Sequence, residues 1–185
     1  MEKLIIVGAG GLGRMTLESA VDKYECFFVD DAFDKGTIIC DVRVIGKIKD
    51  LKHLVKEYKN LIVAIGNNEF REQVTNEAIF YGYNIPTIIN KTAYISPYSK
   101  IGCGTIILSN SSIQNGVRIG NGVVITSSAE MHHDCEIDDY SLIYSNSTIR
   151  TFAKIGKRVK IGSNVSIGNN VIIDNDEIIE NGEVR

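Results

Sequence analysis

The 185-residue sequence lacks several features that assign a chain to a class at once. No apolar run approaches the roughly 20 residues of a membrane-spanning helix, and the apolar start, Leu4 to Ala9, is too short for a signal peptide. The net charge is only −3 at pH 7, so neither nucleic acid nor an anionic membrane is expected as a partner. These absences predict an ordinary globular protein of the cytoplasm.

Cysteine and histidine are also scarce. The four cysteines are scattered, without a CxxC pair or the spacing of zinc ligands, so no metal site is expected and the thiols are interpreted as free in a reducing compartment. Of the three histidines, His53 falls in an expected helix, whereas His132 and His133 are adjacent and precede Asp134. Catalytic chemistry at neutral pH therefore has few candidate side chains.

The second half of the chain carries one long repeat. Isoleucine recurs at every sixth residue from Ile95 to Ile179, and only Met131 interrupts the fifteen positions. Hexapeptide periodicity is the sequence sign of a parallel β-helix. Three hexads make one triangular coil, so isoleucines eighteen residues apart should stack. The glycines that follow five of these isoleucines should provide a positive φ or a close backbone approach. The unbroken register argues against an antiparallel sandwich, which would need varied loops.

The N-terminal part has the pattern of a βαβ unit. An apolar run, Lys3 to Val7, leads directly into Gly8-Ala9-Gly10-Gly11-Leu12-Gly13, and helical spacing follows over Arg14 to Lys23. A second strand, Glu25 to Val29, ends at Asp30-Asp31. Glycines at this spacing, with an acid about 20 residues further on, are typical of nucleotide binding, because amides at the helix start can contact phosphate. A turn that merely packs strand on helix remains an alternative.

The next elements complete a small parallel sheet. We expect a helix over residues 49–58, a buried strand over 61–66, a helix over 69–81 and a strand over 85–89. The sequence thus predicts a half-Rossmann α/β domain over residues 1–90, followed by an all-β parallel β-helix over residues 91–185. The first domain contains only one mononucleotide half, which favours a mononucleotide or a nucleotide sugar over NAD.

These features together resemble one family. The hexads, the glycine turn, Val29-Asp30-Asp31, Ala64-Ile65-Gly66-Asn67 and His133-Asp134-Cys135 are similar to the hexapeptide-repeat sugar acetyltransferases. Within them, the closest resemblance is to the sialic-acid O-acetyltransferase and bacillosamine-type UDP-amino-sugar N-acetyltransferase group. The resemblance implies a left-handed β-helix and a homotrimer with active sites between subunits. It also implies acetyl-CoA as co-substrate, no metal, and an acceptor sugar that is often UDP-linked.

The same resemblance implies roles for individual residues. His133 would be the general base, and Asp134 the acid that pairs with it. The residues matched to nucleotide-sugar binding are Gly8, Gly10, Gly11, Gly13, Asp30, Asp31, Gly66 and Asn67. No residue is matched to CoA. Leu142 stands where the family often has a second histidine, Leu12 replaces a histidine of the glycine turn, and the family's CoA-enclosing tail motif is not found.

We therefore expect an acetyl-CoA-dependent sugar N- or O-acyltransferase, acting on a UDP-linked amino sugar in polysaccharide biosynthesis. One alternative is O-acetylation of a sialic-acid-type sugar. A second is a non-catalytic β-helix protein that binds a nucleotide sugar, which Leu142 favours and the His133-Asp134 pair opposes. A third, an NAD-linked oxidoreductase, rests on the glycine turn alone.

Overall fold

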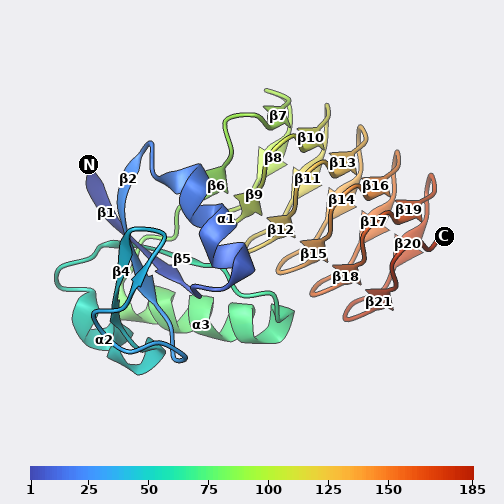
Figure 1. Ribbon diagram of the computed structural model, residues 1–185. Helices are drawn as coiled ribbons and strands as arrows, with labels where there is room; N and C mark the ends of the chain where they lie inside the picture. The colour runs from blue at the N-terminus through green and yellow to red at the C-terminus, as the bar shows by residue number, and fades with distance from the viewer. The chain divides into compact units, whose positions relative to one another are not determined.

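The computed structural model describes residues 1–185, which form two compact units, Met1–Ile88 and Ile89–Arg185 (Figure 1). The first unit contains a five-stranded sheet of order β3-β4-β2-β1-β5. Its strands are β1 (Glu2–Val7), β2 (Tyr24–Val29), β3 (Ile38–Ile39), β4 (Val42–Gly46) and β5 (Asn60–Val63). β1 pairs in parallel with both β2 and β5. Leu4 to Val7 in β1 are fully buried, as expected of a strand in the middle of a parallel sheet.

Two helices directly follow strands of this sheet. α1 (Gly11–Ala20) comes after β1, and α3 (Asn68–Tyr81) comes after β5. The Asn67 side chain accepts the Phe70 N–H at the start of α3, and Gly82, with φ of 90°, ends that helix. An asparagine N-cap and a left-handed glycine are common helix boundaries. No helix of the chain combines the length and the apolar character needed to cross a membrane.

Two expected elements are shorter than the sequence indicated. The helix over residues 49–58 is reduced to η1 (Ile48–Asp50) and α2 (Leu51–Leu54). It ends there because the next turn tightens: the Lys56 and Glu57 amides bond three residues back, to His53 and Leu54, as in a 3₁₀ turn. The strand over residues 85–89 is reduced to β6 (Ile88–Ile89). Its first half contains Pro86, which has no N–H for a strand ladder.

The β3–β4 hairpin was not expected from the sequence. Its strands pair antiparallel, Ile39 opposite Val42, so the turn contains only Cys40 and Asp41. Both have positive φ, 48° and 62°, as a type I′ turn requires. Such turns are recognised in a sequence by Asn-Gly or Asp-Gly pairs, and this one has neither residue pair.

The second unit is a triangular prism of two-residue strands, in which every pairing is parallel (Figure 1). One face consists of β7 (Tyr94–Ile95), β10 (Ser112–Ile113), β13 (Glu130–Met131), β16 (Thr148–Ile149) and β19 (Ser166–Ile167). The second consists of β8 (Lys100–Ile101), β11 (Arg118–Ile119), β14 (Glu136–Ile137), β17 (Lys154–Ile155) and β20 (Ile172–Ile173). The third consists of β6, β9 (Ile106–Ile107), β12 (Val124–Ile125), β15 (Leu142–Ile143), β18 (Lys160–Ile161) and β21 (Ile178–Ile179).

The hexad residues fill the interior of this prism. Isoleucines eighteen residues apart pair directly, as Ile119 does with Ile137, and Met131 is fully buried among them. The small residues two places earlier are buried too. Where they are polar, most of their hydroxyls donate to carbonyls of the next coil, as Ser141 does to Gly156 at 2.7 Å and Ser147 to Gly162 at 2.6 Å, whereas Ser99 donates to Ser96 of its own coil. Buried hydroxyls therefore cost little, because each has a partner.

The turns between strands have a constant backbone pattern. The second residue of a turn usually has φ near +60°, as in Asn110, Asp134 and Phe152. The sequence left open whether the glycines that directly follow isoleucine provide a positive φ or a close backbone approach, and they provide the close approach. At Gly102 a Cβ would lie 2.5 Å from the backbone of Gly120 in the next coil. Glycine at this position therefore lets adjacent coils approach closely.

Candidate functional site

His133 and Asp134 form the two-residue turn between β13 and β14. The φ of Asp134 is 60°, and its carboxylate folds back on the preceding imidazole, with Oδ2 2.9 Å from His133 Nδ1. Both side chains are about half exposed, at 54% and 48%. The turn thus presents a histidine–carboxylate pair to solvent.

Residues from the coils on either side surround this pair. The Gln114 side-chain oxygen accepts the His133 backbone N–H at 3.1 Å. Thr151 Oγ1 lies 3.2 Å from His133 Nε2, and the Phe152 ring packs edge-on against the imidazole with centroids 6.1 Å apart. The sequence alone did not point to these three neighbours. The repeat could have identified Thr151 and Phe152, because they follow His133 and Asp134 by eighteen residues, one full coil.

The geometry indicates which tautomer the neutral imidazole adopts. An ionised carboxylate can only accept a hydrogen bond, so Nδ1 of neutral His133 carries the proton that faces Asp134. The other nitrogen, Nε2, then holds the lone pair. A neutral imidazole oriented by a carboxylate at Nδ1 is suited to remove a proton at Nε2. The pair can therefore act as a general base toward a group bound at the turn.

Other candidate groups in this unit have different surroundings. The His132 imidazole lies 3.4 Å from a Glu130 carboxylate oxygen and so pairs with a different acid from His133. Leu142 is buried, so an apolar side chain occupies the place where the family often has a second histidine. Cys135 is buried in the prism core, and this burial raises the pKa of its thiol to about 12. Its thiol is therefore a packing group and a poor nucleophile.

A surface hollow lies along the face that follows the His133-Asp134 turn. It is lined by charged residues of both signs, Arg118 and Lys154 against Glu136, Asp138 and Asp174. Lys154 and Glu136 neutralise one another at 3.5 Å. This balance gives no excess of positive charge for phosphate groups, so we do not assign a CoA site there. The chain contains no group of three or more potential ligands arranged to hold a metal ion.

In the N-terminal unit, the glycine turn joins β1 to α1. Gly8 has φ of 99°, and a Cβ there would lie 2.7 Å from the Ala64 carbonyl oxygen. A Cβ at Gly13 would overlap the Gly8 carbonyl, so this glycine lets α1 pack on the turn. A Cβ at Gly10 or Gly11 would meet nothing within 4 Å. α1 has no side-chain N-cap, so its first amides remain available to an anion.

The two acids after β2 hold the surrounding loops. Both oxygens of Asp30 accept backbone N–H groups, from Ala9 at 2.7 Å and Ala32 at 2.8 Å. Asp31 accepts the Ile48 N–H at 2.9 Å. Asp30 is therefore bonded to the glycine turn itself, which the sequence did not indicate. Both acids have structural partners, and their contact with a nucleotide remains a prediction.

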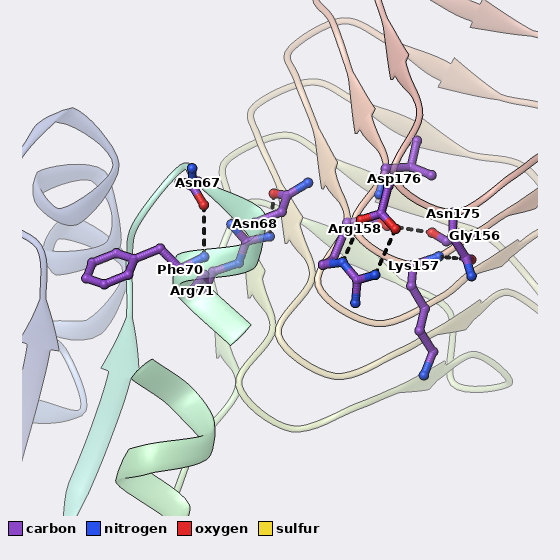
Figure 2. A network of polar contacts seen from close by, with 11 residues as sticks. Asn67, Asn68, Phe70, Arg71, Gly156, Lys157, Arg158, Asn175 and Asp176 are labelled. Carbon is purple, nitrogen blue, oxygen red and sulfur yellow. Dashed lines mark hydrogen bonds and ion pairs between the residues drawn. The ribbon is translucent and has the colours of Figure 1, made fainter. Parts of the chain in front are cut away.

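Gly66 and Asn67 follow β5, whose carboxyl end lies beside that of β1. Asn67 is the N-cap of α3, with its Oδ1 2.8 Å from the Phe70 N–H, as Figure 2 shows. In the same turn, Arg71 is buried and donates to the Ile65 carbonyl at 2.7 Å. The carboxyl ends of β1, β2 and β5 thus bring the glycine turn, Asp30 and the start of α3 to one edge. The strand order reverses at β1, and such switch points bind ligands in open α/β sheets.

Comparison with known proteins finds similar proteins for both units of the chain. The family described as PglD N-terminal domain matches residues 3–78. GDP-perosamine N-acetyltransferase from Escherichia coli O157:H7 is 29% identical over 144 residues, which are 73% of this chain and 64% of that protein. The chain therefore spans less than two thirds of the length of this relative.

Solved structures match over the whole chain. The acetyltransferase domain of PglB from Neisseria gonorrhoeae FA1090 has a TM-score of 0.95 at 27% identity, covering 100% of this chain and 91% of that one. The same domain in complex with acetyl coenzyme A has a TM-score of 0.89 at 28% identity, covering 99% and 95%. A variant of perosamine N-acetyltransferase from Caulobacter crescentus, in complex with CoA and GDP-perosamine, has a TM-score of 0.95 at 23% identity, covering 100% and 89%.

The fold predicted from the sequence is confirmed: a small parallel α/β unit precedes a left-handed parallel β-helix. The last of the three structures supports the fold alone, because its identity is low. The PglD N-terminal domain match, the E. coli GDP-perosamine N-acetyltransferase and the PglB domain confirm the resemblance found in the sequence. The chain is homologous to GDP-perosamine N-acetyltransferase and to the acetyltransferase domain of PglB, and its residues 3–78 match the PglD N-terminal domain.

Proposed function

We propose that this protein is an acetyltransferase that moves the acetyl group of acetyl-CoA to the amino group of a nucleotide-linked sugar. The observation that carries the proposal is the exposed His133-Asp134 pair, with Nδ1 held by the carboxylate. The homologues support an amine as acceptor, since the E. coli relative is named as an N-acetyltransferase. The PglB domain was solved with acetyl coenzyme A, which supports the donor.

The residues of the turn define a direct transfer. His133 Nε2 removes a proton from the acceptor amine while the amine nitrogen attacks the thioester carbonyl carbon. A carbon–nitrogen bond forms, the carbon–sulfur bond breaks, and the proton held by His133 passes to the departing CoA thiolate. The developing oxyanion needs nearby hydrogen-bond donors. The backbone N–H of Thr151 has no hydrogen-bond partner in the chain and is a candidate for this role.

We further propose that residues 1–90 hold the nucleotide diphosphate of the acceptor sugar. The open space at Gly10 and Gly11 and the uncapped start of α1 would accommodate phosphate oxygens. Asp30 and Asp31 would lie near the sugar or base of the nucleotide, with Gly66 and Asn67 at the same edge. This role would belong to the whole edge of the sheet and not to the glycine turn alone. Residues 91–185 would then form the acyltransferase domain, and a cytoplasmic homotrimer remains the prediction of the resemblance.

The test is turnover by the purified chain. Acetyl-CoA is supplied with GDP- and UDP-linked amino sugars, and the acetylated sugar is measured by mass spectrometry, because the exposed Cys40 and Cys103 would react with thiol reagents that detect CoA. Acetylation of the sugar's amino group, which gives an amide, supports the proposal. An acetylated hydroxyl would instead indicate an O-acetyltransferase. Binding of nucleotide sugars without any CoA binding or turnover would overturn the proposal in favour of a non-catalytic binding protein.

His133→Ala tests the base directly, with His132→Ala as its matched control. We expect the first variant to lose turnover by about 10²–10⁴-fold, the usual contribution of a general base, and the second to keep it. The stability of His133→Ala should change by no more than about 0.5 kcal/mol, as at ordinary surface positions. Wild-type turnover in His133→Ala would remove this histidine from the mechanism.

A further inference from the structure

Thr151 contacts the nitrogen of His133 that the proposed reaction uses. Its Oγ1 is 3.2 Å from Nε2, while Asp134 holds Nδ1 at 2.9 Å. The imidazole is therefore bonded at both nitrogens by residues one coil apart. Two hydrogen bonds on opposite sides of the ring fix its rotation about the Cβ–Cγ bond, which one bond does not.

The hydroxyl suits this position in both protonation states of the imidazole. When Nδ1 carries the only proton, Nε2 can only accept, so the Thr151 hydroxyl must donate to it. When His133 has gained a second proton, Nε2 becomes a donor and the same hydroxyl can accept. A hydroxyl is both donor and acceptor, and rotation about one bond changes its role. The contact can therefore persist or re-form on either side of the proton transfer.

The backbone of the same turn supplies a second constraint. Phe152 has φ of 60°, a conformation that is uncommon for bulky residues. Its ring is about half exposed and packs edge-on against His133, at an interplanar angle of 82°. The turn formed by Thr151 and Phe152 thus contacts the imidazole through a hydrogen bond and through an aromatic edge.

We propose that Thr151 is a positioning residue, whose hydroxyl holds the His133 imidazole in the orientation and tautomer needed to accept a proton from the acceptor amine. This inference rests on the proposed function. Before the acceptor binds, the hydroxyl donates to the Nε2 lone pair and sets the orientation of the ring; the acceptor amine then takes that lone pair, and the hydroxyl accepts from Nε2 once it carries the transferred proton. Thr151 acts through His133, so its loss should lower kcat far more than it changes the KM of either substrate.

Three variants separate this role from a merely structural one. Thr151→Val keeps the branched shape and removes the hydroxyl, Thr151→Ser restores a hydroxyl, and Thr148→Val makes the same change in the same coil at a hydroxyl without a hydrogen bond in the chain. We expect kcat to fall about 10–100-fold in Thr151→Val, the scale of a misplaced catalytic group. Thr151→Ser and Thr148→Val should stay near the wild-type kcat. A wild-type kcat in Thr151→Val, or an equal loss in Thr151→Ser, would overturn the proposal.

A second measurement does not depend on turnover. Long-range ¹H–¹⁵N spectra at neutral pH report which His133 nitrogen carries the proton and whether the other accepts a hydrogen bond. We expect the Nε2 resonance to move in Thr151→Val toward the value of a free lone pair and to return in Thr151→Ser. An Nε2 resonance identical in the wild type and in Thr151→Val would overturn the role of Thr151. If the wild type transfers no acetyl group, the proposed function fails, and these spectra still decide whether the hydroxyl positions the ring.

Discussion

Asp134 pairs with its own neighbour in the chain because of its backbone conformation. Adjacent side chains normally diverge, but a φ of 60° at Asp134 turns its carboxylate back to within 2.9 Å of His133 Nδ1. Aspartate and asparagine tolerate this left-handed conformation better than most residues. Asn170 and Asp176 adopt it at equivalent turn positions. The residue type thus serves the turn and the chemistry together.

Asp134→Asn should keep the turn and damage the base. Asparagine adopts the left-handed conformation readily, but its amide can donate to Nδ1 and thereby favour the tautomer with the proton on Nε2. We expect kcat to fall about 10²–10⁴-fold, as when a carboxylate that orients a histidine becomes an amide. The control is Asp176→Asn, the same change at a turn position with φ of 64°. Steady-state kinetics give kcat for both variants, and equal kcat values in Asp134→Asn and Asp176→Asn would show that Asp134 does not orient the base.

Asp176 also shows that such a turn position can have an entirely structural role. Arg158 donates to both of its carboxylate oxygens, from Nε at 2.6 Å and from a terminal nitrogen at 2.8 Å (Figure 2). This hydrogen bond from Arg158 lowers the pKa of Asp176. Any stability the pair provides is therefore present at neutral pH and is lost as the pH falls through that lowered value. Asp176 is exposed and Arg158 is partly exposed, so solvent screens the pair and this contribution is small.

At the scale of elements, the turn one coil before the site makes room for it. Gly116 precedes Asp134 by eighteen residues, has φ of 71°, and a Cβ there would overlap the Asp134 carboxylate oxygen. The coil before the site thus contributes a glycine, which leaves space for the Asp134 carboxylate. The coil after the site contributes Thr151 and Phe152. The site is assembled from three successive coils although only one of them carries the base.

Gly116→Ala should therefore displace the carboxylate from His133. Gly182→Ala is a matched control, because Gly182 has φ of 76° and a Cβ there would meet nothing within 4 Å. Both variants should lose about 1–2 kcal/mol of stability from forcing alanine into a left-handed conformation. Only Gly116→Ala should also lose turnover. Thermal unfolding and kcat measured on both variants separate the two effects, and retained activity in Gly116→Ala would show that the carboxylate is free to move aside.

The glycine turn of the first unit divides its residues between packing and open space. Gly13→Ala places a methyl group against the Gly8 carbonyl and should cost about 1–3 kcal/mol, as overpacking usually does. Gly10→Ala meets no atom and should change stability by no more than about 0.5 kcal/mol. If phosphate binds at this turn, Gly10→Ala should weaken the binding of a nucleotide sugar. Urea unfolding and calorimetric titration test both statements. Unchanged affinity in Gly10→Ala would place the nucleotide elsewhere.

The sequence predicted the elements of the two units with unequal success, for a physical reason. In the β-helix each coil repeats the same spacing, so the register alone indicated the parallel coils and which isoleucines stack eighteen residues apart. In the α/β unit the boundaries depend on local turns, such as the one at Cys40-Asp41, which lack a residue signature. The contacts of Asp30 with Ala9 could not be predicted, because they join residues brought together only by the sheet.

At the scale of the whole chain, stability is distributed differently in the two units. The interior of the prism is one continuous column in which each coil contacts the coils before and after it. In such repeat structures, stability is roughly the sum of coil stabilities and nearest-neighbour interfaces. A defect in a middle coil breaks two interfaces at once. The α/β unit has a separate core around β1 and β5, so damage to the prism need not extend to it.

Ile119→Asp tests this difference, with Ile172→Asp as its control. Ile119 is only 5% exposed, inside the second coil of its face, whereas Ile172 is 69% exposed. An unpaired carboxylate at the first position should cost on the order of 3–5 kcal/mol, a large part of a typical folding free energy of about 5–15 kcal/mol. At the second it remains in water and should cost little. We expect Ile119→Asp to lose the prism in urea well before the α/β unit, when hydrogen exchange is followed for each unit separately. Simultaneous loss of both units would instead show that they fold as one cooperative body.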